Sequence, residues 1–166
     1  MKEIDIRQVK ESAVKLINDD WALLSAGNEN SWNTMTVSWG GLGELWNKDV
    51  AFVFVRPQRY TKEFMDKDGR FTLSFFGGKM KKEMGVCGSL SGRDGDKALA
   101  AGISPVFDCD GVYIDSAEYV IFCKTLYTDF IDPDGFVDKT LDEKNYSQKD
   151  YHKVYVAQIE KVLKKN

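Results

Sequence analysis

Apolar and polar side chains alternate between residues 33 and 39, and this pattern predicts a β-strand with one packed and one polar face. Met35, Val37 and Trp39 are apolar, whereas Thr36 and Ser38 between them carry hydroxyl groups. Glycines then occupy three of the positions 40–43. They predict either backbone amides that approach a ligand closely or a loose turn.

A second strand is predicted over residues 50–55, VAFVFV, which are apolar without a break. Such a strand is expected to be buried on both faces, inside a closed barrel or under a partner. It ends in the sequence RPQRYT, where a proline that cannot donate a ladder hydrogen bond stands between two arginines. A helix is predicted over residues 60–67, ending at Gly69, so its N-terminus lies beside these arginines.

The RPQRYT segment has two interpretations. A helix N-terminus presents unpaired amides and a partial positive charge, so Arg59 and Thr61 beside it would form a pocket for a phosphate or carboxylate. In the other interpretation the arginines lie on a solvated loop and Thr61 only caps the helix. The later segment SGRDGDK has the same ambiguity, since Arg93 and Lys97 either meet that anion or pair with the neighbouring aspartates on the surface.

The remaining pattern predicts further strands and short helices. In the first half they are a helix over 7–17 broken at 18–20, a strand from Trp21, a turn at 27–30, a strand over 71–76 and a core-packed helix over 79–87. In the second half they are a helix from about Asp96 to Gly102, a hairpin turning at Asp110-Gly111 and a long strand over 116–131. A polar excursion over 132–150 and a final strand through Val154 and Val156 complete the chain. These seven to eight strands indicate a mainly β barrel with short peripheral helices, formed as a single domain over residues 1–166. The apolar strands at 50–55 and 116–131 also suggest a homodimer.

Composition excludes several classes of partner. The 166 residues carry a net charge of −3 with scattered lysines, which argues against nucleic acid and anionic membranes. No apolar signal core or membrane span is apparent, so we expect a soluble cytoplasmic protein. Cys87, Cys109 and Cys123 lack CxxC spacing, which argues against disulfides and a metal site and predicts small buried thiols. The single histidine, His152, is expected to be solvated rather than catalytic.

Three segments together resemble a known family. NTMTVSWGG, RPQRYT and SGRDGDK occur in the order found in the flavin reductase-like, FMN-binding split-barrel proteins, which include flavoredoxin-type electron carriers. The resemblance covers about residues 15–131. It implies a split β-barrel that dimerises and binds FMN near the dimer interface.

The resemblance also assigns site residues by matching motif. One strand would border the isoalloxazine ring with main-chain groups and hydroxyls, through Thr34, Met35, Thr36, Val37, Ser38 and Trp39. Side chains of the basic turn and of the next strand would hold the phosphate and ribityl chain, namely Arg56, Arg59, Tyr60, Thr61 and Ser74. Arg93 and Lys97 would close over the phosphate end.

No acid–base side chain is required for this chemistry, because a bound flavin itself accepts hydride or electrons. The resemblance implies an NAD(P)H-dependent flavin reductase. The alternatives are a flavoredoxin-like carrier that exchanges electrons with a redox partner protein, and a flavin-binding domain without turnover. The sequence has no glycine fingerprint for a nicotinamide cofactor, but such a site need not be of the Rossmann type.

Overall fold

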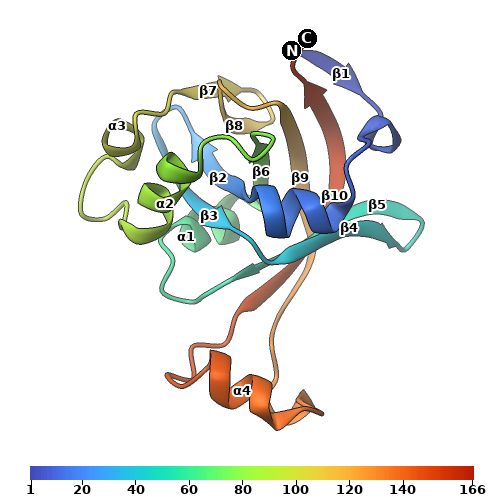
Figure 1. Ribbon diagram of the computed structural model, residues 1–166, viewed down its shortest axis with the longest axis vertical. Coiled ribbons are helices and arrows are strands. Elements are labelled where there is room, and N and C mark those ends of the chain that lie inside the picture. Colours follow the sequence, from blue (N-terminus) through green and yellow to red (C-terminus); the bar gives the residue numbers. More distant parts are fainter.

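The computed structural model describes all 166 residues, and an eight-stranded antiparallel sheet dominates it (Figure 1). The strand order is β3-β2-β6-β9-β10-β5-β4, and β1 adds to β10. Their bounds are β1 Lys2–Ile4, β2 Ala22–Asn28, β3 Ser31–Val37, β4 Gly40–Leu45, β5 Lys48–Val55, β6 Arg70–Phe75, β9 Tyr119–Phe130 and β10 Lys153–Lys164. The sheet curls into a barrel, and because the edge strands β3 and β4 do not pair, the barrel is split between them.

Short helices and one hairpin surround this sheet. The helical elements are η1 Ile6–Gln8, η2 Lys15–Asp20, α1 Thr61–Asp68, α2 Lys81–Ser89, α3 Lys97–Ala101, η3 Pro133–Gly135 and α4 Lys139–Asn145. The hairpin pairs β7, Pro105–Asp108, with β8, Gly111–Ile114. Residues 131–151, which we call the arm, leave the barrel between β9 and β10 and carry α4 at their far end (Figure 1). None of the helices has the length and apolar character needed to cross a membrane.

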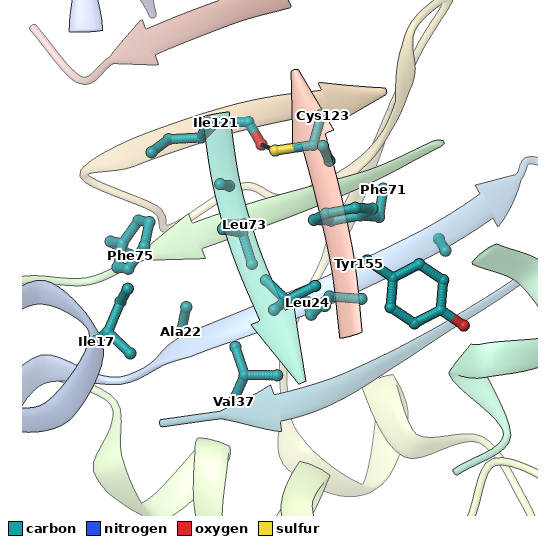
Figure 2. Packing of buried hydrophobic residues seen from close by; sticks show 14 of the residues in the cluster. Ile17, Ala22, Leu24, Val37, Phe71, Leu73, Phe75, Ile121, Cys123 and Tyr155 are labelled. Atoms are coloured by element: carbon teal, nitrogen blue, oxygen red, sulfur yellow. Dashed lines mark hydrogen bonds between the residues drawn. The ribbon is translucent and has the colours of Figure 1, made fainter. Parts of the chain in front are cut away.

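The barrel interior holds the larger of two cores. Figure 2 shows Leu24, Phe71, Ile121 and Tyr155 among the side chains of this core, from strands β2, β6, β9 and β10. Each of these side chains is at most 1 % exposed, and burying one side chain of this size contributes about 1.5–3 kcal/mol. Tyr119, Ile121 and Cys123 in the first half of the predicted long strand all belong to this interior core.

A second core covers the outer face of the same strands. Leu23 and Val120 directly precede the interior residues Leu24 and Ile121, so their side chains face outward. They pack there against Met84 and Cys87 of α2 and against Ile114 of β8. Strands β2, β6 and β9 are thus buried on both faces within one chain. This confirms α2 as a core-packed helix and explains the apolar character of residues 119–123 without a partner subunit.

The N-terminal helix is misplaced by the sequence prediction. The structure has a single 3-10 turn at η1, and its longer helical element covers residues 15–20, which include the expected break at 18–20. Leu16 and Ile17 pack into the barrel interior, while Lys15 Nζ donates to the Asp20 carboxylate (2.6 Å) and offsets its charge. The expected break is therefore only partly wrong, because the helical turns continue through Asn18 and Asp19 and end at Asp20.

The prediction of a turn or ligand loop at the glycine-rich residues 40–43 is also corrected, because residues 40–45 form strand β4. This strand pairs with β5 along its length, from Gly40 opposite Val53 to Leu45 opposite Lys48. A side chain at Gly40 would collide with the Phe52 carbonyl oxygen, so glycine permits this close pairing. The prediction that β5 is buried on both faces is wrong in part, since Phe52 and Phe54 are half-buried.

Smaller corrections concern the hairpin, the arm and one cysteine. The β7–β8 turn consists of Cys109 and Asp110, one residue earlier than predicted, because Asp108 pairs with Gly111. Cys109 is therefore exposed at a hairpin tip, whereas Cys87 and Cys123 are buried as expected. The excursion contains helix α4, which its polar composition did not predict.

Candidate functional site

The split in the barrel creates a cleft along the free edge of β3. The end of β5 and the start of β10 form its other wall, where Lys153 pairs with Val55 and so sets His152 beside Arg56. A cavity of about 210 Å³ lies here. It is lined by Met35, Thr36, Val37, Ser38, Trp39, Phe54, Arg56, Arg59 and His152. Five of the six residues predicted on this strand, all but Thr34, are therefore brought together.

Strand β3 offers main-chain groups more than side chains to a ligand in this cleft. Met35 and Val37 bury their side chains in the barrel core, and β3 pairs only with β2, so the outer edge of its main chain is free. Thr36 donates its hydroxyl hydrogen to the Met84 carbonyl, which leaves only acceptor capacity. Ser38 is half-buried and makes no side-chain hydrogen bond within the chain.

A second cavity, of about 360 Å³, follows along the same strand. It is lined by Asn30, Ser31, Trp32, Asn33, Thr34, Tyr60, Gly92, Gly95, Asp96, Lys97 and Ala98. The SGRDGDK loop thus folds back beside the RPQRYT turn. This placement is the one required if Arg93 and Lys97 are to meet the same anion as Arg59. Lys97 is 7 % exposed, and its Nζ donates to the Thr34 carbonyl oxygen at the free edge of β3 (2.8 Å).

The four predicted cations differ in whether a carboxylate neutralises them. Arg56 forms an ion pair with Asp150 (2.7 Å), and Arg93 forms one with Glu63. Arg59 instead donates to the Gly88 carbonyl oxygen (2.8 Å), and neither it nor Lys97 has a carboxylate partner.

Burial lowers the pKa of Lys97, and the nearby charge of Arg59 lowers it further. Two adjacent cations without a counter-ion disfavour one another until an anion arrives. This end of the cleft is therefore electrostatically suited to a phosphate or carboxylate.

Thr61 and Tyr60 lie in different surroundings. Thr61 is fully buried and its Oγ1 accepts from Asn33 Nδ2 (2.8 Å), so it joins α1 to β3 and does not cap the helix. Tyr60 lines the second cavity, and the Arg93 guanidinium lies 4.6 Å from its ring centre. The backbone amides of Lys62 and Glu63 already donate to the carbonyls of Arg59 and Tyr60. The N-terminus of α1 therefore has fewer free donors than expected.

Ser74 lies outside both cavities. It is fully buried in β6, where its hydroxyl accepts from the Ile114 backbone amide (3.3 Å) under the second core. The strand prediction was right, but the residue faces the side that β8 covers. The predicted surface pairing of Arg93 and Lys97 with neighbouring aspartates is also absent.

Two cleft residues escaped the sequence reasoning. Phe54 lies in β5 two positions before Arg56, which directly follows the strand, so the period of a strand could have placed both on one face. His152 was expected to be solvated, yet it is 7 % exposed and its Nδ1 lies 2.8 Å from Tyr146 Oη. The partner Tyr146 is on the arm, and no local pattern connects them.

The cleft combines three kinds of surface. Phe54 and the half-exposed Trp39 provide an aromatic wall, the β3 edge provides main-chain donors and acceptors, and Arg59 with Lys97 provides positive charge. No carboxylate lines the 210 Å³ cavity. This arrangement suits a planar, polar-edged ring that carries an anionic tail.

A family model for the flavin reductase-like domain matches residues 17–164. The chain belongs to this family. The resemblance inferred from the three motifs is thereby confirmed, and the match extends past the arm to the last strand.

Solved structures of similar fold agree with the architecture. An FMN-binding domain of a flavin reductase-like enzyme from Shewanella baltica has 17 % sequence identity and a TM-score of 0.69, covering 97 % of this chain and 75 % of that chain. Flavoredoxin from Desulfovibrio vulgaris has 18 % identity and a TM-score of 0.68, covering 100 % and 77 %. A split-barrel protein from Shewanella frigidimarina has 13 % identity and a TM-score of 0.70, covering 98 % and 76 %. No curated protein matches this chain.

Proposed function

We propose that this flavin reductase-like protein binds FMN in the cleft along β3 and works as an FMN-dependent oxidoreductase. The observation that carries the proposal is the pair of cations without a counter-ion, Arg59 and Lys97, at one end of a cleft with an aromatic wall. FMN has the complementary parts, a planar ring with a polar edge and a phosphate tail. The two cavities, of about 210 and 360 Å³, follow one another along β3 and suit a ligand that extends along the strand.

Each part of the cleft has a distinct task in this proposal. Arg59 and Lys97 hold the phosphate. Arg93, whose guanidinium lies over the Tyr60 ring, contributes less because Glu63 already neutralises its charge. The free edge of β3 and the Ser38 hydroxyl bind the polar edge of the ring. Phe54 and Trp39 cover its apolar surface and exclude water.

Bound FMN supplies the redox chemistry, because it accepts a hydride and passes electrons on singly or in pairs. The protein positions it and leaves one side of the cleft open to a second reactant. We infer that this reactant is NADH or NADPH, which makes the protein a flavin reductase. The absence of a carboxylate from the cavity favours a negatively charged electron donor.

An electron carrier of the flavoredoxin type is the second candidate. Trp39 at the cleft is 48 % exposed, so an edge of the cleft lies on the molecular surface, where a redox partner protein could approach. The two candidates require the same FMN site and differ only in the electron donor.

Anaerobic mixing distinguishes them. The FMN-loaded protein is mixed with NADH or NADPH, and the flavin absorbance is followed over time. A reductase bleaches rapidly with at least one nucleotide. A carrier keeps its colour with both nucleotides and bleaches only with a reduced partner protein or dithionite. A flavin that dithionite reduces but no biological donor reduces would contradict the oxidoreductase proposal.

A further inference from the structure

Besides the ion pair between Arg56 and Asp150, a buried hydrogen bond ties the arm to the cleft. Tyr146, in the arm just after α4, is 4 % exposed, and its Oη lies 2.8 Å from Nδ1 of His152. Aromatic neighbours Phe136 and Tyr151 pack around Tyr146, with ring centres 5.9 and 4.9 Å away. His152 is in turn a lining residue of the 210 Å³ cavity.

The direction of this hydrogen bond follows from what Tyr146 can reach. A buried phenol must donate its single hydrogen, and Nδ1 of His152 is the only partner of the Tyr146 hydroxyl. Nδ1 must then be unprotonated. In a neutral imidazole the hydrogen is consequently on Nε2.

Nε2 is the ring atom available to a ligand. It forms no hydrogen bond within the chain, and it is not among the buried polar atoms that lack a partner. Since the ring is otherwise enclosed by Trp39 and Phe54, with centroids at 5.3 and 6.5 Å, the remaining exposure of His152 faces the cavity.

The charges around His152 keep it neutral. Burial is the main cause that lowers its pKa, to about 4, and the cations Arg56 and Arg59 lower it further, whereas Asp150 opposes them. Tyr146 adds no charge at neutral pH, because burial raises its pKa.

We propose that Tyr146 is a positioning residue that fixes His152 as a neutral donor, with its Nε2–H directed into the cleft toward a hydrogen-bond acceptor of the bound ligand. The arm is then part of the cleft rather than a separate lid. The contact to FMN rests on the proposed function, but the tautomer of His152 does not.

The test uses the single histidine of the chain, so that one imidazole signal reports on one site. Nitrogen-15 NMR of the full-length protein is recorded from pH 4 to 8 without flavin and after saturation with FMN. We expect an unprotonated Nδ1 and a protonated Nε2 down to about pH 5. FMN should shift the Nε2 resonance and slow its hydrogen exchange.

Two phenylalanine variants supply the matched comparison. Tyr146→Phe removes the hydroxyl that bonds to Nδ1, so we expect a mixture of tautomers and a titration midpoint raised by about 0.4–1 pH unit. Tyr151→Phe removes a hydroxyl from the same aromatic cluster that bonds instead to Asp142 (2.9 Å), and should leave the histidine signal unchanged.

The outcomes separate the two proposals. A hydrogen on Nδ1, or an imidazolium at pH 7 in the wild-type protein, overturns the positioning role even if a variant fails to fold. FMN that binds without affecting Nε2 overturns the donor role. A flavin fluorescence titration that detects no FMN binding overturns the proposed function alone, because the tautomer is measured in the flavin-free protein.

Discussion

Arg59 differs from the other arginines near the cleft because no carboxylate neutralises it. We expect Arg59→Ala to remove a charge-assisted contact worth about 1.5–3 kcal/mol, which weakens FMN roughly ten- to hundredfold. Riboflavin, which lacks the phosphate, should lose far less. Fluorescence titration with both ligands measures the difference.

Arg70→Ala is a suitable control, since Arg70 lies at the start of β6 and pairs with Glu160 (2.7 Å) outside the cleft. It should bind both flavins normally. Equal losses of FMN and riboflavin in Arg59→Ala would mean that the substitution loosens the fold and that the phosphate is held elsewhere.

The Asp66 carboxylate accepts hydrogen bonds from three side chains of α1 and β10. Burial alone would raise its pKa, but hydrogen bonds from Lys153, Lys62 and Tyr155 outweigh this and lower it to about 2. A lowered carboxyl pKa stabilises the fold above the unfolded value near 4, and this contribution is lost as pH falls toward 2.

We expect Asp66→Asn to lower the free energy of unfolding at pH 6 by about 1–2 kcal/mol, a range that allows for solvent screening of a partly exposed group. The difference from wild type should shrink as the pH falls from 4 to 2. Urea unfolding at several pH values measures it, and a difference that stays constant with pH would show that the carboxylate charge is not the cause.

At the scale of elements, the loop 89–96 depends on one glycine. A side chain at Gly92 would collide with the Asn33 amide and contact the Tyr60 ring at 3.1 Å, whereas nothing lies within 4 Å of the corresponding position at Gly95. Gly92→Ala should therefore displace the loop and disturb the hydrogen bond from Asn33 to Thr61.

We expect Gly92→Ala to destabilise the protein by about 1–3 kcal/mol and to weaken FMN binding, while Gly95→Ala changes both much less. Thermal unfolding and flavin titration test this pair. Similar behaviour of the two variants would contradict the tight packing of the loop over the β3 edge.

Local pattern predicted the elements that carry a clear period. Strands β3, β6, β9 and β10 and helices α1 and α3 were found because their alternation or their glycine ends are local signals. Strand β4 was missed because its glycines usually mark turns, and only pairing with β5 makes them a strand. The site shows the same limit of local pattern. Arg59 and Lys97 were predicted because they stand in recognisable motifs, whereas the burial of His152 depends on its contact with Tyr146 of the arm, which no local pattern indicates.

At the scale of the whole molecule, we predict a homodimer, although for a different reason from the one that the sequence suggested. The first half of β9 is covered within the chain, but Leu126, Tyr127 and Phe130 in its second half are exposed. Trp46 at the β4–β5 turn is 56 % exposed and packs edge-on against Tyr127, with ring centres 6.4 Å apart. Such a cluster marks an interaction surface.

Light scattering should give twice the chain mass of 18.8 kDa at micromolar concentration. Tyr127→Lys should shift the protein toward the monomer by placing a charge in the cluster, and Lys124→Ala on the exposed face of the same strand should not. A mass near 18.8 kDa for the wild type at all concentrations would rule out the dimer.

If the split of this barrel holds FMN, the flavin content of the purified protein should show it. Protein purified from cells is denatured, the released chromophore is identified by chromatography, and flavin-free protein is then titrated with FMN. We expect a yellow protein that releases FMN and rebinds it saturably at one molecule per chain. A colourless protein that fails to bind added FMN would contradict it.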